Sequence, residues 1–203
     1  MILERFITPG MGVNLYLVGA GKQVIMIDPG TIIPKVDELI EERGYELQAI
    51  VLTHGHADHI GGAEYYRDKY HVDVYIHQAD DEMLQNPKHN LSKGVYGYDI
   101  SIEGAIVYQD KDRLDLGDIR VEIIHTPGHT KGSSCLLIND QLFSGDTLFK
   151  MGVGRWDLYG GDGQALMNSI KSKIFTLKDM PVYPGHGVAT SIAYEKERNP
   201  FVG

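Results

Sequence analysis

Cysteine is almost absent from this 203-residue chain: Cys135 is the only one, so no disulfide can form within it. A zinc site built from several cysteines is excluded for the same reason, because each thiolate ligand needs its own cysteine. Basic residues are also scarce, with 19 Lys and Arg against 28 Asp and Glu and a net charge of −9. This negative charge disfavours non-specific binding, so we expect neither nucleic acid nor a membrane as a partner.

Long hydrophobic runs are missing too. No apolar stretch approaches the roughly 18 residues that a membrane-spanning helix needs. The first five residues lack the basic and then apolar segments of a secretion signal, so we expect a cytoplasmic protein. With 42% hydrophobic and 23% charged residues, the composition is that of an ordinary globular chain. The length predicts a single domain over residues 1–203 and leaves the oligomeric state open.

Short apolar strands alternate with amphipathic segments along the chain. We predict strands at residues 24–27, 49–52, 72–76, 106–108, 121–124, 135–138 and 142–143. Helices are predicted at residues 34–43, 59–70, around 166–174 and at 189–198. Residues 87–102 are predicted to form a long surface loop. Strands mixed with helices indicate the α/β class, with a sheet core covered by helices.

Histidine or aspartate follows four of the predicted strands at the point where each strand ends. The four loops read THGHADH from residue 53, HTPGHT from 125, SGDT from 144 and PGHG from 184. Strand ends on a rigid sheet are where α/β proteins gather functional groups, so these side chains are expected to converge.

The first of these loops has the spacing of a metal site. His54 and His56 are two residues apart, so in an extended segment both point the same way and can bind one cation. Asp58 and His59 stand where the next helix is expected to begin, turned toward a second position. Imidazole and carboxylate suit zinc and also iron or manganese, so the ligand types do not choose among these metals.

The pattern HxHxDH, followed by a distant His, an Asp and a final His, resembles the motif of the metallo-β-lactamase superfamily over essentially the whole chain. The resemblance implies a four-layer αββα sandwich, in which two mixed sheets lie face to face with helices outside. It also implies two divalent metal ions, with zinc expected first and iron or manganese as alternatives. The implied ligands are His54, His56 and His129 for the first metal, Asp58, His59 and His186 for the second, and Asp146 bridging both.

Such a centre activates water without a Ser or Cys nucleophile. Two cations about 3.5–4 Å apart share a hydroxide, make it abundant near neutral pH and polarise a carbonyl oxygen. The expected nucleophile is therefore a hydroxide between the metals, with Asp58 and Asp146 as the catalytic carboxylates. Cys135 lies in an apolar run and is expected to pack in the core.

The segment after Asp146 resembles the glyoxalase II (hydroxyacylglutathione hydrolase) group, and more closely its short bacterial relatives, which often carry GRxDxxGGD. Here that pattern spans residues 154–162. The resemblance implies hydrolysis of a small-molecule thioester to an acid and a thiol. Arg155, Lys150 and Trp156 are expected to contact the substrate. Glyoxalase II tends to have Lys where Arg155 stands and Tyr where Asp157 stands, and its extra helical region after the last His is expected to be absent here.

Two other functions compete with the hydrolase. A persulfide dioxygenase would use a single iron at the first site and has a similar GRxD loop, although Gly160-Gly161-Asp162 favours the hydrolase. A metal-binding regulatory protein without turnover is the third possibility. Asp28 is expected either to orient a metal ligand or only to form the turn before Pro29. His125 is expected outside the site, and the histidines at 71, 77 and 89 at the surface.

Overall fold

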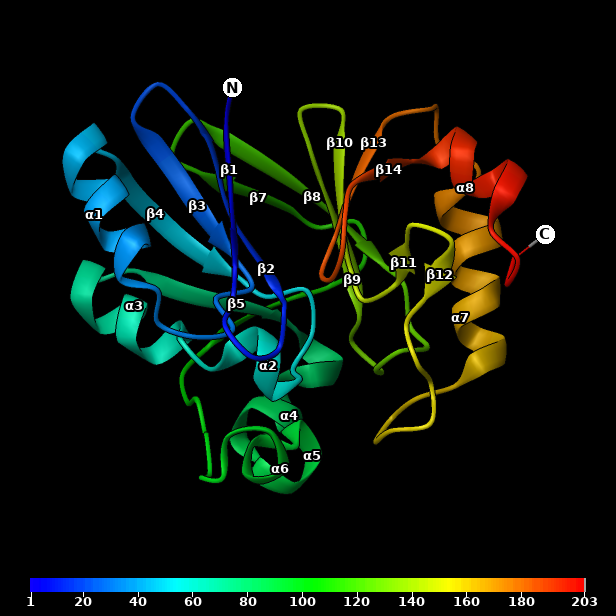
Figure 1. The fold of residues 1–203 in the computed structure, drawn as a ribbon, viewed down its shortest axis with the longest axis horizontal. Coiled ribbons are helices and arrows are strands. Elements are labelled where there is room, and N and C mark those ends of the chain that lie inside the picture. Colours follow the sequence, from blue (N-terminus) through cyan, green and yellow to red (C-terminus); the bar gives the residue numbers. More distant parts are fainter. Residues whose placement is uncertain (203) are drawn as a thin grey trace.

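Two six-stranded sheets lie face to face in the computed structural model, which describes residues 1–202 (Figure 1). The first sheet contains, in spatial order, β1 (Ile2–Ile7), β2 (Asn14–Ala20), β3 (Gln23–Ile27), β4 (Glu46–Val51), β5 (Asp73–His77) and β6 (Ile106–Tyr108). β1 to β3 are antiparallel, whereas β3 to β6 are parallel. The carboxyl ends of β3 and β4 therefore meet at the same edge of the sheet.

The second sheet is also mixed. It contains β14 (Thr190–Ser191), β13 (Pro181–Pro184), β10 (Gln141–Gly145), β9 (Ser134–Ile138), β8 (Ile119–His125) and β7 (Arg113–Leu116). β10 and β13 are parallel, and β8 runs in the same direction because β9 is antiparallel to both of its neighbours. Three loops that follow these strands thus leave the sheet at one edge. A hairpin of β11 (Leu148–Phe149) and β12 (Gly152–Val153) adjoins it.

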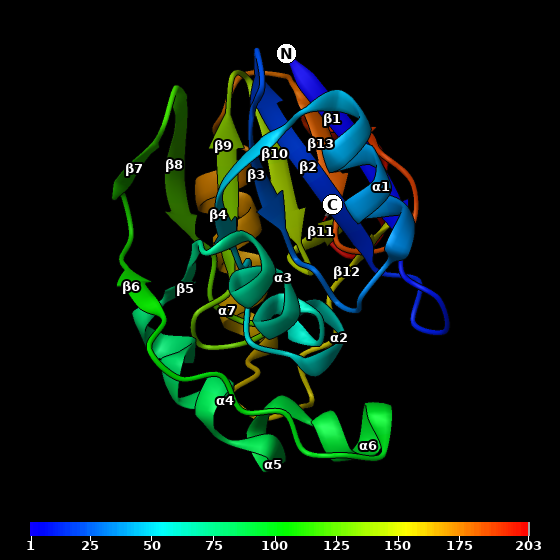
Figure 2. The ribbon, with the colours of Figure 1, turned by 90° about the vertical axis from the view of Figure 1, so that its left-hand side faces the viewer.

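Helices cover the outer faces of both sheets. Over the first sheet lie α1 (Pro34–Arg43), α2 (Ala57–Ile60) and α3 (Ala63–Tyr70), in front of the strands in Figure 2. Over the second lie α7 (Gly163–Ser169), continued by a π-helical turn (Ile170–Ile174), and α8 (Ile192–Arg198) (Figure 1). A 3₁₀ turn (Gln78–Asp80) leads into α4 (Asp81–Gln85), α5 (Pro87–Asn90) and α6 (Ser92–Tyr96), below the sheets in both views.

Three apolar clusters correspond to the three interfaces of this sandwich. Val36 and Ile40 of α1 pack with the outer face of the first sheet. Ile25 and Val121 belong to the cluster between the two sheets. Cys135 lies in the third cluster, beneath α7, and burial raises the pKa of its thiol to about 11, so it is a packing residue as predicted. The α/β class and the four-layer αββα arrangement are confirmed.

Helix α1 matches its prediction at both ends because the sequence carries both end signals. Pro34 occupies the first turn, and Gly44 closes the helix in the left-handed conformation with φ 60°. The predicted strands are present with bounds that differ by at most three residues, whereas β1, β2, β7, β11, β12 and β14 were not predicted. The predicted helix at 189–198 begins only at Ile192, because Thr190 and Ser191 pair with β13 instead.

The predicted helix at 59–70 is two helices. The backbone N–H of Gly62 donates to Pro29 O at 2.7 Å instead of to the carbonyl four residues earlier. A side chain at Gly62 would stand 2.7 Å from the backbone of Thr31, so only glycine permits this approach. The break separates α2, which carries Asp58 and His59, from α3.

The prediction of a long surface loop at 87–102 is wrong, because the segment contains the short helices α5 and α6. Asn86 accepts a hydrogen bond from the N–H of Lys88 and caps α5. The amide of Asn90 donates to Met83 O and Ile100 O and so ties the two ends of the segment together. Among the described residues, no helix has both the length and the hydropathy to cross a membrane.

His77 is buried, contrary to its predicted surface position, with 6% of its surface exposed. Its ring stacks on that of His125 at 3.9 Å between centroids, and Ala79 N donates to its Nδ1. Burial, together with the nearby His125, lowers the pKa of His77 to about 4. The neutral ring is therefore the form that the folded chain accommodates.

The depressed pKa of His77 predicts a loss of stability in acid. An unfolded chain takes up a proton at this ring near pH 6.5, whereas the folded chain does so only near pH 4. Between these values the free energy of unfolding falls by about 1–2 kcal/mol as the pH falls. Urea unfolding of His77→Gln is expected to show a shallower decline from pH 7 to pH 4 than the wild type. Parallel declines would contradict this assignment.

Candidate metal centre

All seven predicted ligands come together where the two sheets open at one edge. His54 and His56 follow β4, and the short helix α2 carries Asp58 and His59. The second sheet contributes the remaining three residues from the loops after β8, β10 and β13, namely His129, Asp146 and His186. Parallel strands end at the same edge, so segments more than 100 residues apart in sequence converge there.

The first group consists of His54, His56 and His129, whose ligand atoms lie within 4.8 Å of one another. Nε2 of His129 is 2.9 Å from Nδ1 of His56 and 3.2 Å from Nε2 of His54. All three side chains are buried. Three imidazole nitrogens facing one point form a donor set typical of a transition-metal site.

The second group consists of Asp58, His59 and His186, also within 4.8 Å of one another. Nε2 of His186 is 3.4 Å from Oδ2 of Asp58. Asp146 lies between the two groups: its carboxylate is 3.4 Å from His59 and 3.6 Å from both His129 and His186. This is the position that a residue shared by two cations would occupy.

Hydrogen bonds behind the rings fix which nitrogen faces the centre. Nδ1 of His59 donates to Oδ2 of Asp28 at 2.8 Å, and Nδ1 of His129 donates to Arg155 O at 2.6 Å. The hydroxyl of Thr53 donates to Asp28 at 2.6 Å and faces Nδ1 of His54 at 3.1 Å. Each Nε2 is thereby directed inward, which is how second-shell partners orient metal-binding histidines. Asp28 is thus placed to orient ligands as well as to form a turn.

The charge distribution also favours bound cations. Burial and the neighbouring imidazoles hold the pKa of His54 well below its usual range and lower that of His56 to about 3, so both rings are neutral. Burial opposes ionisation of Asp146, but His59 beside it holds its pKa below the ordinary value. Burial also opposes protonation of His59, but Asp146, Asp28 and Asp58 raise its pKa well above 6.5. Three carboxylates in one place demand positive charge, which divalent cations supply.

Unpaired buried atoms give an independent test of whether metals fit. Within the described residues, Nε2 of His59 and Oδ1 of Asp146 are buried without a hydrogen-bond partner. They face each other at 3.4 Å without forming a hydrogen bond. Buried polar atoms are rarely left unpaired, because each costs about 1–3 kcal/mol. Other unpaired buried atoms lie elsewhere in the described residues, but these two belong to the centre and are atoms that ligation would satisfy, so the residues fit a metal centre.

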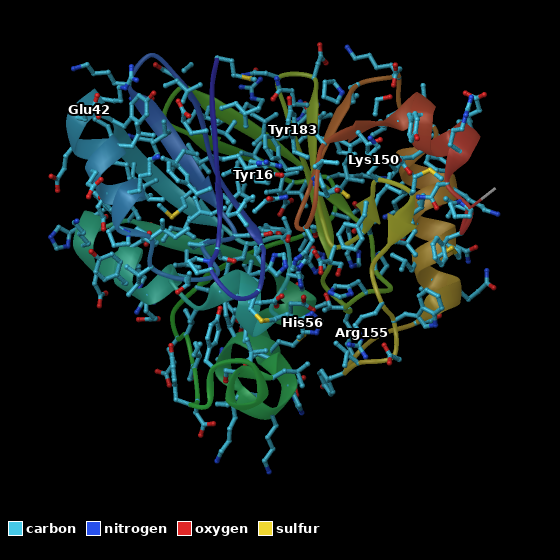
Figure 3. The ribbon with its side chains drawn as sticks, in the orientation of Figure 1. Tyr16, Glu42, His56, Lys150, Arg155 and Tyr183 are labelled. Atoms are coloured by element: carbon cyan, nitrogen blue, oxygen red, sulfur yellow. The ribbon has the colours of Figure 1, made fainter. Side chains whose placement is uncertain are left out.

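A cavity of about 390 Å³ opens onto the centre and is lined by His56, Asp58, His129, Asp146 and His186 together with seven further residues. Of the predicted substrate contacts, Arg155 lines it, and it lies to the right of His56 in Figure 3. Lys150 lines an adjoining depression with His186, and its ammonium lies 5.7 Å from the ring centre of Tyr194. Trp156 is 43% exposed, and its indole packs near Gly163. Substrate binding by Lys150 and Trp156 stays a prediction.

One further expectation has a clear outcome, and one buried residue near the centre was not expected. His125 lies outside the centre, where its Nε2 donates to Lys131 O at 2.8 Å and its ring stacks on His77. Asp80, which the sequence analysis did not single out, is fully buried and joins the loops of the first group. It accepts hydrogen bonds from Gly55 N, from the Thr130 hydroxyl and from Gly132 N. Apart from its own strand-end position after β5, no local pattern marks it.

Removal of the Asp80 carboxylate is expected to loosen the first group. Asp80→Ala leaves three buried donors without an acceptor, which predicts a loss of about 3 kcal/mol in the free energy of unfolding. Misplacement of the loops that carry His56 and His129 is expected to weaken metal affinity about 10–100-fold. Metal titration and urea unfolding measure the two effects. Asp81→Ala, at a neighbouring site where the side chain bonds only to Gln85, is the matched control and is expected to change neither.

The family model of the metallo-β-lactamase superfamily matches residues 8–186, so this chain belongs to that superfamily. The probable metallo-hydrolase YqgX of Bacillus subtilis is 36% identical over 93% of this chain and 92% of its own. The hydroxyacylglutathione hydrolase GloC of Haemophilus influenzae is 33% identical over 89% and 88%.

Solved structures agree on the fold. The BLEG-1 B3 metallo-β-lactamase has a TM-score of 0.93 and 32% identity, covering 99% of both chains. TTHA1623 in a di-iron-bound form has a TM-score of 0.87 and 32% identity, covering 98% of this chain and 99% of its own. ETHE1 from Myxococcus xanthus has a TM-score of 0.77 and 28% identity, covering 98% and 84%. A metal centre in this chain agrees with these neighbours, whereas zinc in particular stays a prediction.

Proposed function

We propose that this protein hydrolyses small-molecule thioesters at the centre formed by the seven converging side chains. The observation that carries the proposal is the placement of Asp146 between two ligand groups at the floor of a cavity. The likeness to the hydroxyacylglutathione hydrolase GloC supports the thioester class. The GRxDxxGGD loop, which resembles that of the short glyoxalase II relatives, supports the thioester class further. This loop contacts the centre, since His129 donates to the Arg155 carbonyl within it.

The residues fit two divalent cations. His54, His56 and His129 would hold the first and Asp58, His59 and His186 the second, with Asp146 shared; zinc, iron and manganese all suit these ligands. When bound, such cations would lower the pKa of a bound water molecule and polarise the acyl oxygen.

The chain's own residues prepare this reaction. Asp28 and Arg155 O hold the rings of His59 and His129 in place, so little reorganisation is needed when the substrate arrives. Asp58 lines the cavity, and although burial opposes ionisation, His59 and His186 lower its pKa and keep it ionised, so that its carboxylate can accept a hydrogen bond from water and orient it. The oxygen of water bonds to the acyl carbon and the carbon–sulfur bond breaks. The sulfur leaves as a thiol, with the proton that the water lost.

A substrate panel tests this proposal. Metal-loaded protein is assayed for thiol release from several acyl thioesters, for oxygen uptake with glutathione persulfide, and for opening of a chromogenic β-lactam. We expect thioester hydrolysis that His56→Ala abolishes. Persulfide-dependent oxygen uptake with one iron per chain would establish the dioxygenase instead. Absence of all turnover in protein with a full metal complement would favour the regulatory alternative.

A further inference from the structure

We infer that the substrate is an uncharged thioester with an apolar acyl chain, and that thiol carriers bearing carboxylates, such as glutathione, are disfavoured. The inference rests on the proposed thioester hydrolysis and names the substrate class for the same cavity. It comes from the residues that line the cavity beyond the metal centre.

The outer wall of the cavity is apolar and is built from four separate segments. Met11 comes from the turn between β1 and β2, and Leu91 and Val95 come from the segment of α5 and α6. Phe149 of β11 and Leu158 of the loop before α7 complete the wall. An acyl chain that packs against these side chains is removed from water. This burial contributes about 0.8 kcal/mol of binding free energy for each methylene.

The two polar residues of this wall already form hydrogen bonds within the protein. Asn90 is fully buried, its amide donates to Met83 O and Ile100 O, and its oxygen accepts from Ser92 N. The guanidinium of Arg155 forms two hydrogen bonds to the carboxylate of Asp157, at 2.8 and 2.9 Å. Arg155 and Asp157 together present no net charge to a substrate. A substrate carboxylate that approached Arg155 would also meet the charge of Asp157.

The two nearby lysines lie outside this cavity, and Lys150 lines only the adjoining depression. The ammonium of Lys131 lies 4.9 Å from the ring centre of Tyr159, and that of Lys150 lies 5.7 Å from that of Tyr194. Neither belongs to the lining of the cavity. Since the whole chain carries a net charge of −9, its long-range field repels anions as well.

A contact at the surface links the two segments that carry Leu91 and Leu158. The rings of His89, in α5, and Tyr159, next to Leu158, are stacked with centroids 3.7 Å apart. The hydroxyl of Tyr159 also lies 3.3 Å from the carboxylate of Glu82. Leu91 and Leu158 each lie within two residues of this stack, so they face the cavity from fixed positions.

The first arm of the test varies the acyl chain. Thioesters of the neutral thiol N-acetylcysteamine, from acetyl to hexanoyl, are expected to show kcat/KM rising about fourfold per methylene. Leu158→Ser is expected to flatten this dependence. Val107→Ser, at a 46% exposed position on the edge strand β6, is the matched control and should keep the wild-type slope. Binding of S-alkyl thioether analogues, followed by the fluorescence of Trp156, the only tryptophan, should show the same trend.

The second arm varies the charge of the thiol. The same acyl group on glutathione is expected to be cleaved with at least about tenfold lower kcat/KM than on N-acetylcysteamine. Asp157→Asn leaves the charge of Arg155 uncompensated, so it should raise kcat/KM for the glutathione thioester several-fold through a lower KM. It should leave the neutral thioester unchanged. Asp115→Asn is the control, because it removes an equally exposed ion pair, between Asp115 on β7 and Arg120 on β8 at 2.8 Å. It is expected to change kcat/KM for neither thioester.

The possible results separate this inference from the proposed function. A preference for the glutathione thioester, or the absence of any chain-length dependence, would overturn the inference while thioester hydrolysis stands. If no thioester is cleaved although the metal content is full, the proposed function fails, and the inference fails with it.

Discussion

Asp146→Ala is expected to remove hydrolysis almost completely, with a fall of about 10³-fold or more in kcat/KM, and to leave the protein with no more than one metal per chain. The carboxylate lies 3.4–3.6 Å from histidines of both groups, so its loss affects both cations at once. A centre with two cations is expected to stabilise the transition state by several kcal/mol. Each 1.4 kcal/mol corresponds to a tenfold change in rate.

Elemental analysis and initial rates measure this effect separately. Asp140→Ala is the control, since that aspartate is exposed on the turn between β9 and β10 and pairs only with Lys178. It should retain two metals and full activity. An Asp146→Ala variant that keeps both metals and more than a tenth of the wild-type rate would contradict the bridging position of this residue.

Gly185→Ala is expected to have the second largest effect, although it adds a single methyl group. A Cβ at this position would overlap Oδ1 of Asp146 and would lie 2.7 Å from Cε1 of His59. Gly185 also bonds through its N–H to Gly145 O and through its carbonyl to Asn14 N, so the backbone cannot move away. We expect about 1–3 kcal/mol lower stability and about 100-fold lower activity, because the second ligand group is displaced.

Gly94→Ala provides the matched control. Nothing lies within 4 Å of a Cβ built at Gly94, which has no left-handed backbone requirement, so stability and metal content should stay unchanged. Thermal unfolding with and without added metal distinguishes the two variants: Gly185→Ala should lose most of the stabilisation that metal gives the wild type. Equal metal-dependent stabilisation in both variants would show that the second group tolerates the methyl.

The candidate ligands could be predicted because their pattern is local and chemically specific. His54, His56, Asp58 and His59 are spaced so that one loop and one helical turn serve two positions. Helix α1 was predictable for a similar reason, since Pro34 and Gly44 mark its ends. Such signals depend on residues a few positions apart and do not need the fold.

Residues that act across long sequence separations could not be found in this way. Asp80 joins the loops of Gly55 and Gly132, which lie 25 and 52 residues away, and a lone aspartate carries no local sign of that role. Asn90 ties the two ends of its segment together through hydrogen bonds to carbonyls seven and ten residues away, beyond the reach of any local helix or turn pattern. The break after α2 depends on Pro29 O, which belongs to another loop.

The sequence by itself determined the α/β class and the HxHxDH motif, because periodicity and the spacing of these four residues are encoded by near neighbours, and its resemblance to a known family implied the seven residues that would hold metal. Only the tertiary structure decided which nitrogen of each ring faces the centre, that Asp146 stands between the two groups, and that Asp157 neutralises Arg155. These features depend on hydrogen bonds and burial between segments that the chain brings together only when the two sheets pack.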